Sequence, residues 1–245
     1  PDLVWNKGRN DATYHNMLQD SIRGTQKFIK ADTSDAEATN SANSGLLSFD
    51  SDGFTVGYGS QAAWNKSGKT FAAWNWKGGG SASSNGNGSI TSSVSANASA
   101  GFSIVSYTGD DAASATVGHG LGLAPDVVIV KSRSDTTGWM TYHRSKGPGG
   151  YLVLNTNSSW IGGSGYDVPF ANTNPTSSVF SVGDGGGNWG TNETGETYIA
   201  YCFSGIEGYS KFGFYKGIGG SGSTPNNDGV FVYTGFKPAF VLIKK

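Results

Sequence analysis

The sequence predicts an all-β protein built from tandem antiparallel β-sandwich modules, and three observations predict it. Short segments rich in β-branched and aromatic residues follow one another along the chain, separated by Gly, Asn, Asp and Ser. Aromatic residues make up 13% of the 245 residues, so the chain has enough apolar area to fold although it contains 39 glycines. Long stretches of sequence also occur more than once, which is typical of duplicated modules.

The strand pattern is clearest in four segments, at residues 89–95, 102–107, 151–154 and 197–201. Each is short, rich in β-branched or aromatic residues, and bounded by residues that favour turns. Tight-turn dipeptides are found at Asp52-Gly53, Asn87-Gly88 and Asp228-Gly229. Helix signals are sparse, and only residues 15–24 have a pattern that fits one or two helical turns.

A strand motif with Pro and Lys six residues apart occurs three times, at residues 1–7, 125–131 and 238–244. Pro125 lies 124 residues after Pro1, and Pro238 lies 113 residues after Pro125. Two further pairs of segments match, residues 65–74 with 192–201 and residues 53–57 with 179–183. The repeat is therefore roughly 110–125 residues long, which is about the size of one β-sandwich domain.

The positions of the repeats predict the domain organisation. We expect residues 1–80 to form an incomplete first module that lacks its opening strands, residues 84–213 a complete second module, and residues 214–245 the opening strands of a third. The Gly-, Ser- and Asn-rich stretch 78–101 predicts the first junction. Because the chain begins with Pro1, we expect a processed chain or a fragment. We also expect the surplus strand at residues 231–245 to pair with an exposed sheet edge of a neighbouring copy.

Composition and charge exclude several functions. The net charge is −1 and only 14% of the residues are charged, so the sequence predicts no nucleic-acid partner. The longest apolar run is short, so no membrane insertion is expected. A polar surface of Ser, Thr, Asn and Gly is typical of fibrous and cell-surface proteins. The one cysteine, Cys202, lies in an apolar strand-like run and is predicted to be a small buried hydrophobic residue.

The chemistry-bearing residues do not form a recognisable active site, so we expect no enzyme. His15, His119 and His143 lack partners at metal-ligand spacing, and we expect neither a metal nor a cofactor. The run Asp50-Ser51-Asp52-Gly53 could begin a calcium loop, but further oxygens and a downstream Glu are missing, which favours a plain Asx turn. A polysaccharide depolymerase is the enzymatic alternative, and it would need an acidic cleft.

Four aromatic residues in loop-like surroundings are the candidate ligand-binding residues: Trp139, Trp160, Tyr166 and Trp189. A flat ring can stack on the apolar face of a sugar while neighbouring amides bond its hydroxyls. The alternative is that these rings pack at the ends of the sandwich or between modules or subunits. Trp5, Trp74 and Trp76 stand at strand positions, where core or interface packing is expected.

Four phrases of the sequence resemble a family of repeated modules found in tail and tail-fibre proteins of bacteriophages, particularly marine phages and cyanophages. The phrases are a Gly-Phe-x-Pro strand at residues 235–244, a Ser-Phe-x-x-Asp-Gly-Phe turn at 48–54, a Tyr-Ile-Ala-Tyr strand at 195–203 and a Gly-Tyr-Ser-Lys-Phe-Gly junction at 208–215. The resemblance covers nearly the whole chain, and the four phrases are more specific together than any one is alone.

This resemblance implies a lectin-like sandwich of the jelly-roll, concanavalin-like kind in a non-enzymatic virion protein with a structural and host-recognition role. It implies a homo-oligomer, trimeric in a fibre, whose partners are copies of itself, other tail proteins and a host-surface glycan. It carries no catalytic residues with it. The alternative is a carbohydrate-binding lectin or adhesin domain that is secreted or displayed on a cell surface, because a fold does not by itself define a function.

Overall fold

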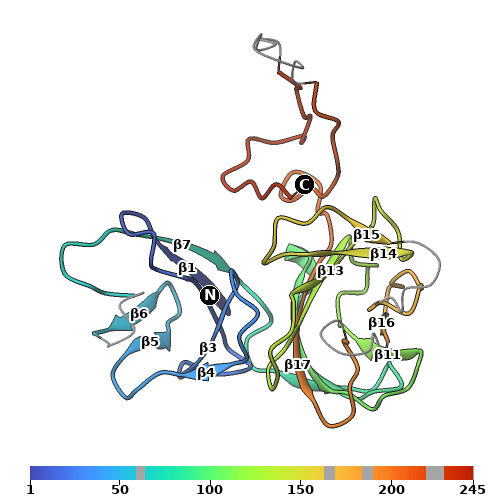
Figure 1. The fold of residues 1–245 in the computed structure, drawn as a ribbon, viewed down its shortest axis with the longest axis horizontal. Helices are drawn as coiled ribbons and strands as arrows, with labels where there is room; N and C mark the ends of the chain where they lie inside the picture. Colours follow the sequence, from blue (N-terminus) through green and yellow to red (C-terminus); the bar gives the residue numbers. More distant parts are fainter. Residues whose placement is uncertain (59–63, 163–168, 184–189, 219–228, 245) are drawn as a thin grey trace.

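The computed structural model describes residues 1–58, 64–162, 169–183, 190–218 and 229–244. Its regular structure is almost entirely antiparallel β-sheet, which confirms the predicted all-β sandwich class. The strands form two groups that lie side by side in Figure 1, with the C-terminal segment in red above them. We use module 1 for residues 1–80, module 2 for residues 84–213 and C-terminal segment for residues 214–245.

Module 1 contains a five-stranded sheet with strand order β4-β3-β2-β1-β7. A hairpin of β5 and β6 covers one face of this sheet, and the predicted turn at Asp52-Gly53 connects the two hairpin strands. The strand bounds are β1 Leu3–Gly8, β2 Asn16–Asp20, β3 Lys27–Lys30, β4 Ala38–Thr39, β5 Gly45–Phe49, β6 Phe54–Gly57 and β7 Phe71–Trp76.

Module 2 contains an eight-stranded sheet with strand order β15-β14-β13-β12-β17-β10-β9-β8, and a two-stranded sheet of β11 and β16 covers one of its faces. The strand bounds are β8 Ser83–Asn85, β9 Ser92–Asn97, β10 Phe102–Thr108, β11 Ala115–Gly118, β12 Val127–Ser132, β13 Met140–His143, β14 Gly150–Val153, β15 Ile161–Gly162, β16 Val179–Val182 and β17 Thr197–Phe203. A single 3-10 turn, η1 (Ala98–Ala100), precedes β10.

Three hydrophobic cores separate four layers of sheet, as the order of the strands across Figure 1 shows. One core lies between the β5–β6 hairpin and the five-stranded sheet, and another lies between the eight-stranded sheet and β11–β16. The third core joins the two large sheets to each other, with Leu3 and Ile29 of module 1 packed in the same cluster as Ile104 and Ile199 of module 2. The modules therefore share a core.

The first two copies of the repeated strand motif occupy equivalent positions in the two sheets. Strand β1 lies between β2 and β7, and β12 lies between β13 and β17. The registers also correspond, since Leu3 is paired with Asp20 and Trp76 while Val127 is paired with His143 and Phe203. Both faces of these central strands are buried, which explains why the sequence of β12 is a continuous apolar run.

Hydrogen bonds explain the polar residues of the motif. The Asp2 carboxylate accepts from the backbone N–H of Gly78 at 2.8 Å, and Asp126 accepts from Gly205 in the same way at 2.6 Å. Each aspartate thus fixes the turn that follows the last strand of its module. The lysines at the other end of the motif also have parallel roles, because Lys7 and Lys131 each donate to a backbone carbonyl in the loop that follows their strand.

The structure differs from the local expectations in three segments. Residues 15–24 contain strand β2 and a turn instead of helix, because Met17 and Leu18 point to opposite faces of a sheet that is covered on both sides. The stretch 78–101, which was predicted to contain the first junction, contributes two strands, β8 and β9, to the sheet of module 2. The described part of the C-terminal segment forms no strand, because no described strand lies beside residues 238–244 as β13 and β17 lie beside β12.

Among the described residues, no helix has the length and apolar character that a membrane-spanning segment requires.

Candidate functional site

Trp139, the first candidate ligand-binding residue, lies in the core that joins the two modules. Its side chain is 0% exposed, and it packs in the same cluster as Leu18 and Ile29 of module 1. Its indole N–H donates to the carbonyl oxygens of Lys30 at 3.1 Å and Thr33 at 3.2 Å. Trp139 therefore presents no ring face to a ligand. Its role is to pack between the modules, which was the alternative given for the four aromatic candidates.

Trp160 lies at the other edge of module 2, where it is half-buried. Its ring covers Gly150 and Gly162, which face each other across β14 and β15, and a Cβ atom at either glycine would overlap the ring. The Lys146 ammonium lies 5.8 Å from the ring centroid, within the range of a cation–π contact. This is an aromatic surface beside a cation, which is one chemistry that a sugar or an acidic glycan would use.

The two remaining candidates, Tyr166 and Trp189, lie outside the described residues. Their assignment as ligand-binding residues stays a prediction.

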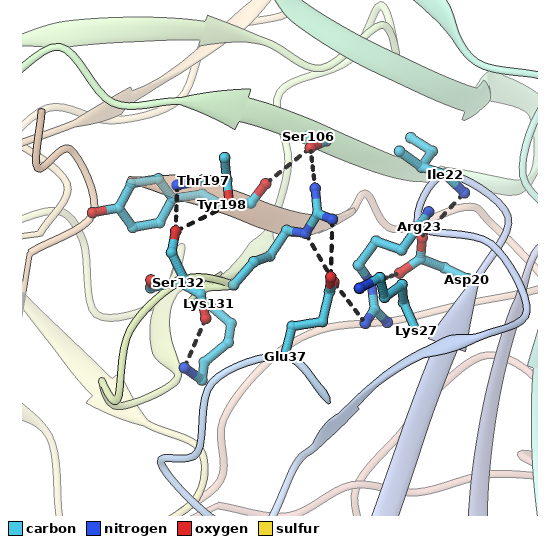
Figure 2. A network of polar contacts seen from close by, with 12 residues as sticks. Asp20, Ile22, Arg23, Lys27, Glu37, Ser106, Lys131, Ser132, Thr197 and Tyr198 are labelled. Carbon is cyan, nitrogen blue, oxygen red and sulfur yellow. Dashed lines mark hydrogen bonds and ion pairs between the residues drawn. The ribbon is translucent and has the colours of Figure 1, made fainter. Parts of the chain in front are cut away.

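A network of polar contacts lies at the junction of the modules (Figure 2). Arg23, which follows β2, donates through Nε to Asp20 at 2.6 Å, and both side chains are 0% exposed. Arg133, which follows β12, forms a two-pronged ion pair with Glu37 of module 1, with distances of 2.9 and 3.1 Å. The Tyr201 hydroxyl of β17 completes the cluster by donating to Asp20 at 2.8 Å.

The charges of this junction cluster balance, since two arginines face two carboxylates. Both oxygens of Asp20 and both oxygens of Glu37 accept hydrogen bonds from arginine, hydroxyl or backbone N–H donors. Burial alone would lower the pKa of Arg23, but the neighbouring Asp20, Tyr201 and Glu37 have the larger combined effect, so its pKa is raised. Burial also raises the pKa of Tyr201 well above its usual range. The cluster is thus a saturated structural network that fixes one module on the other.

A surface groove of about 430 Å³ lies at the end of β7, beside the β5–β6 turn. It is a second candidate ligand site, because Trp76 lines it together with the exposed polar side chains of Asn75, Asp52 and Lys77. The exposed amide and carboxylate provide hydrogen-bonding groups for a polar ligand such as a sugar, while the Trp76 ring packs in the core between the modules. The volume is within the usual range for small-ligand sites.

Trp76 was predicted to pack in the core or at an interface, and the structure confirms this packing. The ring lies 6.4 Å from Phe102 and 6.2 Å from Phe203, in the core between the modules, and it remains half-buried at the groove. Asn75 was the signal in the sequence that could have pointed to the groove. An Asn between two tryptophans on a strand points to the opposite face from both rings, so it is available to line a polar surface. The turn residues that complete the groove could not be linked to β7 from the sequence.

The histidines and the cysteine lie apart from one another. His119 is buried and bonded to the backbone at Thr176 and Leu121, and burial lowers its pKa. Cys202 is 0% exposed in the core of module 2, which confirms the predicted buried hydrophobic residue, and burial raises its pKa to about 12. Within the described ranges, no three His, Cys, Asp or Glu side chains are grouped closely enough to hold a metal ion.

These features define an antiparallel β-sandwich protein in which the first two copies of the repeated strand motif occupy equivalent positions. The chain belongs to the family described as Domain of unknown function (DUF7483), whose model matches residues 1–245. No curated protein and no solved structure matches the sequence.

Proposed function

We propose that this protein is a non-enzymatic virion module of a phage tail or tail fibre, with a structural and host-recognition role. The observation that carries the proposal is the shared core and balanced ion network between the modules, because they make one rigid unit from two duplicated sandwiches. A rigid unit with a low-charge surface is suited to holding recognition sites at a fixed distance from a particle. The resemblance of the repeated phrases to phage tail modules supports the same role.

The proposed partners are copies of this chain, other tail proteins and a host-surface glycan, and the proposed location is the virion. Multivalent display of weak sites would give overall affinity, as it does for linked binding modules in general. No step of this role needs a catalytic group, a metal or a cofactor.

Antibody labelling tests the structural part of the proposal. Antibodies raised against the purified chain should label the tail or fibres of the particles whose genome encodes it, as seen by electron microscopy. Labelling of the host-cell surface instead of the particle would contradict the proposal. Release of reducing sugars from host capsule by the purified chain would contradict its non-enzymatic character.

The second candidate function is that of a carbohydrate-binding lectin or adhesin domain, secreted or displayed on a cell surface. The groove at the end of β7 favours it, since the exposed side chains of Asn75, Asp52 and Lys77 line it and can bond sugar hydroxyls. The lectin candidate and the virion module would both bind glycans, but only the virion module would be found on particles.

Glycan-array binding by the full chain and by two surface variants separates the two candidate sugar sites. Asn75→Ala should remove binding at the groove, and Trp160→Ala should remove binding at the β14–β15 edge, while both variants keep the fold because the side chains are exposed or half-buried. Trp139→Ala is unsuitable here, since it opens the core between the modules. Binding that survives both substitutions would exclude both sites.

A further inference from the structure

The outer edge of β7 differs from the other edges of the two large sheets. Strands β4 and β15 are two residues long and β8 is three residues long, so these edges offer little backbone for pairing. Strand β7 is six residues long, with the sequence Phe-Ala-Ala-Trp-Asn-Trp, and has no charged residue and no proline. Long edges without charge or proline are the ones that accept another strand.

Module 2 shows which strand this edge accepts. The equivalent strand, β17, is covered on its outer side by β10, which pairs antiparallel with it from Phe102 opposite Phe203 to Thr108 opposite Thr197. The rings of Tyr107 and Tyr198 stack in this pair with a centroid distance of 5.0 Å. Strand β7 has β1 on its inner side, and no described strand pairs with its outer side.

The C-terminal segment carries a second copy of the β10 sequence. The run Ile-Val-Ser-Tyr-Thr-Gly at residues 104–109 corresponds to Val-Phe-Val-Tyr-Thr-Gly at residues 230–235, at an offset of 126. Unlike β10, the copy is exposed to solvent. Val230 is 37% exposed, Phe231 86%, Val232 46% and Tyr233 70%. Four consecutive exposed residues of the β-branched or aromatic type indicate a segment that can pair with a partner strand.

Contacts that follow residues 230–233 in the chain fix the C-terminal part of the segment. The Phe240 ring packs on the rings of Trp74 and Trp76, at 5.6 and 5.7 Å, and Lys244 donates to backbone carbonyls of module 2. In Figure 1 the segment rises above both modules. Residues 230–233 are exposed and do not pair with any described strand, so the β7 edge of another molecule can reach them.

We propose that residues 230–234 of one copy add to the outer edge of β7 in a second copy, as an antiparallel strand equivalent to β10. The register of β10 and β17, transferred by the two offsets, places Val232 opposite Ala72 and Tyr233 opposite Phe71. Tyr233 then stacks on Phe71 as Tyr107 stacks on Tyr198. Because the donor and acceptor surfaces differ, the contact is head-to-tail and builds chains or closed rings.

Disulfide trapping between two single-cysteine forms of the full chain tests this register. Val232→Cys chains mixed with Ala72→Cys chains should give a disulfide-linked 1:1 dimer, since opposite residues of paired strands lie within disulfide range. A link within one chain is impossible in this mixture, and the native Cys202 is fully buried. The matched control mixes Val232→Cys with Asn75→Cys, three residues out of register on the same strand.

The in-register pair should form at least about tenfold faster than the control pair, because pairing raises the effective concentration of the two thiols. Equal rates for the two pairs would overturn the proposal. Sedimentation of the unmodified chain gives an independent test, in which self-association should rise with concentration and be lost in Val232→Pro, which lacks the N–H that a paired strand requires. A wild-type chain that stays monomeric across the concentration range, or a Val232→Pro chain that associates equally, would also overturn it.

Discussion

Modules 1 and 2 have the same arrangement of central strands, which we call the frame, but they differ in the strands that border and cover it. In both, the repeated strand lies in the middle of the sheet, with an aspartate at one end and a lysine at the other that bond the same parts of the module. In module 2 the frame continues through β10, β9 and β8, whereas in module 1 it stops at β7. The covering sheet also differs, because β5–β6 is a local hairpin while β16 takes its partner β11 from ahead of β12.

The repeated motif therefore forms the same central strand in both modules, whereas the residues around it differ and make different contacts. Two equivalent pairs of positions show this. Asp20 and Arg23 form a buried ion pair at the junction in module 1, and the corresponding positions in module 2 are occupied by the half-buried His143 and the exposed Lys146. The same place in the frame therefore fastens the modules together in one copy and borders the Trp160 surface in the other.

The largest expected effect comes from breaking the buried pair in module 1. Arg23→Met should lower the free energy of unfolding by about 3–5 kcal/mol, because it leaves the Asp20 carboxylate buried without its cation. The matched control is Lys146→Met at the equivalent position of module 2, which should change stability by no more than about 1 kcal/mol because the ammonium is exposed. Urea denaturation of both variants measures the difference, and similar losses would contradict the contrast between the modules.

An intermediate loss of stability is expected from removing the motif aspartate, which has the same hydrogen bond in both modules. Asp2→Ala and Asp126→Ala should each lower the free energy of unfolding by about 1–3 kcal/mol, since each removes the acceptor of a turn N–H. The two losses should agree within about 1 kcal/mol, because the equivalent turns have the same hydrogen bond. If one aspartate variant unfolded like the wild type while the other was destabilised, the prediction would be contradicted. The two turns would then have the same geometry but contribute different free energies to stability. The measurement is urea denaturation of both variants.

The sequence was sufficient to predict the fold class and the central strands of the two large sheets. Residues 102–107 and 197–201 were predicted as strands and correspond to β10 and β17, because alternating or continuous apolar residues between turn residues are a local signal. Asn16–Asp20 was missed, since Asn, Gln and Asp are poor strand formers and its burial comes from sheets far away in sequence.

The candidate sites were harder to predict, because exposure depends on how the modules pack. Trp139 and Trp160 have similar Gly- and Ser-rich neighbours, yet one is sealed between two sheets and the other covers two glycines at a sheet edge. The groove was missed because it combines β7 with a turn about 25 residues earlier in the chain, and nothing in either segment alone points to the other.

The smallest expected effect concerns the lysine of the module 2 motif. Lys131 is 0% exposed and donates to the carbonyls of Ser132 and Asp135, and burial lowers its pKa to about 8. An unfolded chain would hold this proton up to a pKa of about 10.4. Between these two values the unfolded state binds more protons than the folded state, so the contribution of Lys131 to stability rises with pH in this window.

Unfolding free energies of the wild type and of Lys131→Met, measured at pH 7.5 and at pH 9, isolate this contribution. All other titrating groups are common to the two proteins, so their effects cancel in the difference. The wild type should gain about 1 kcal/mol relative to Lys131→Met between the two pH values, because the folded lysine loses its proton over this interval while the unfolded one keeps it. Parallel pH profiles would mean that Lys131 stays charged when buried, held by the carbonyls of its loop. In that case the loop contacts would outweigh the cost of burying the ammonium.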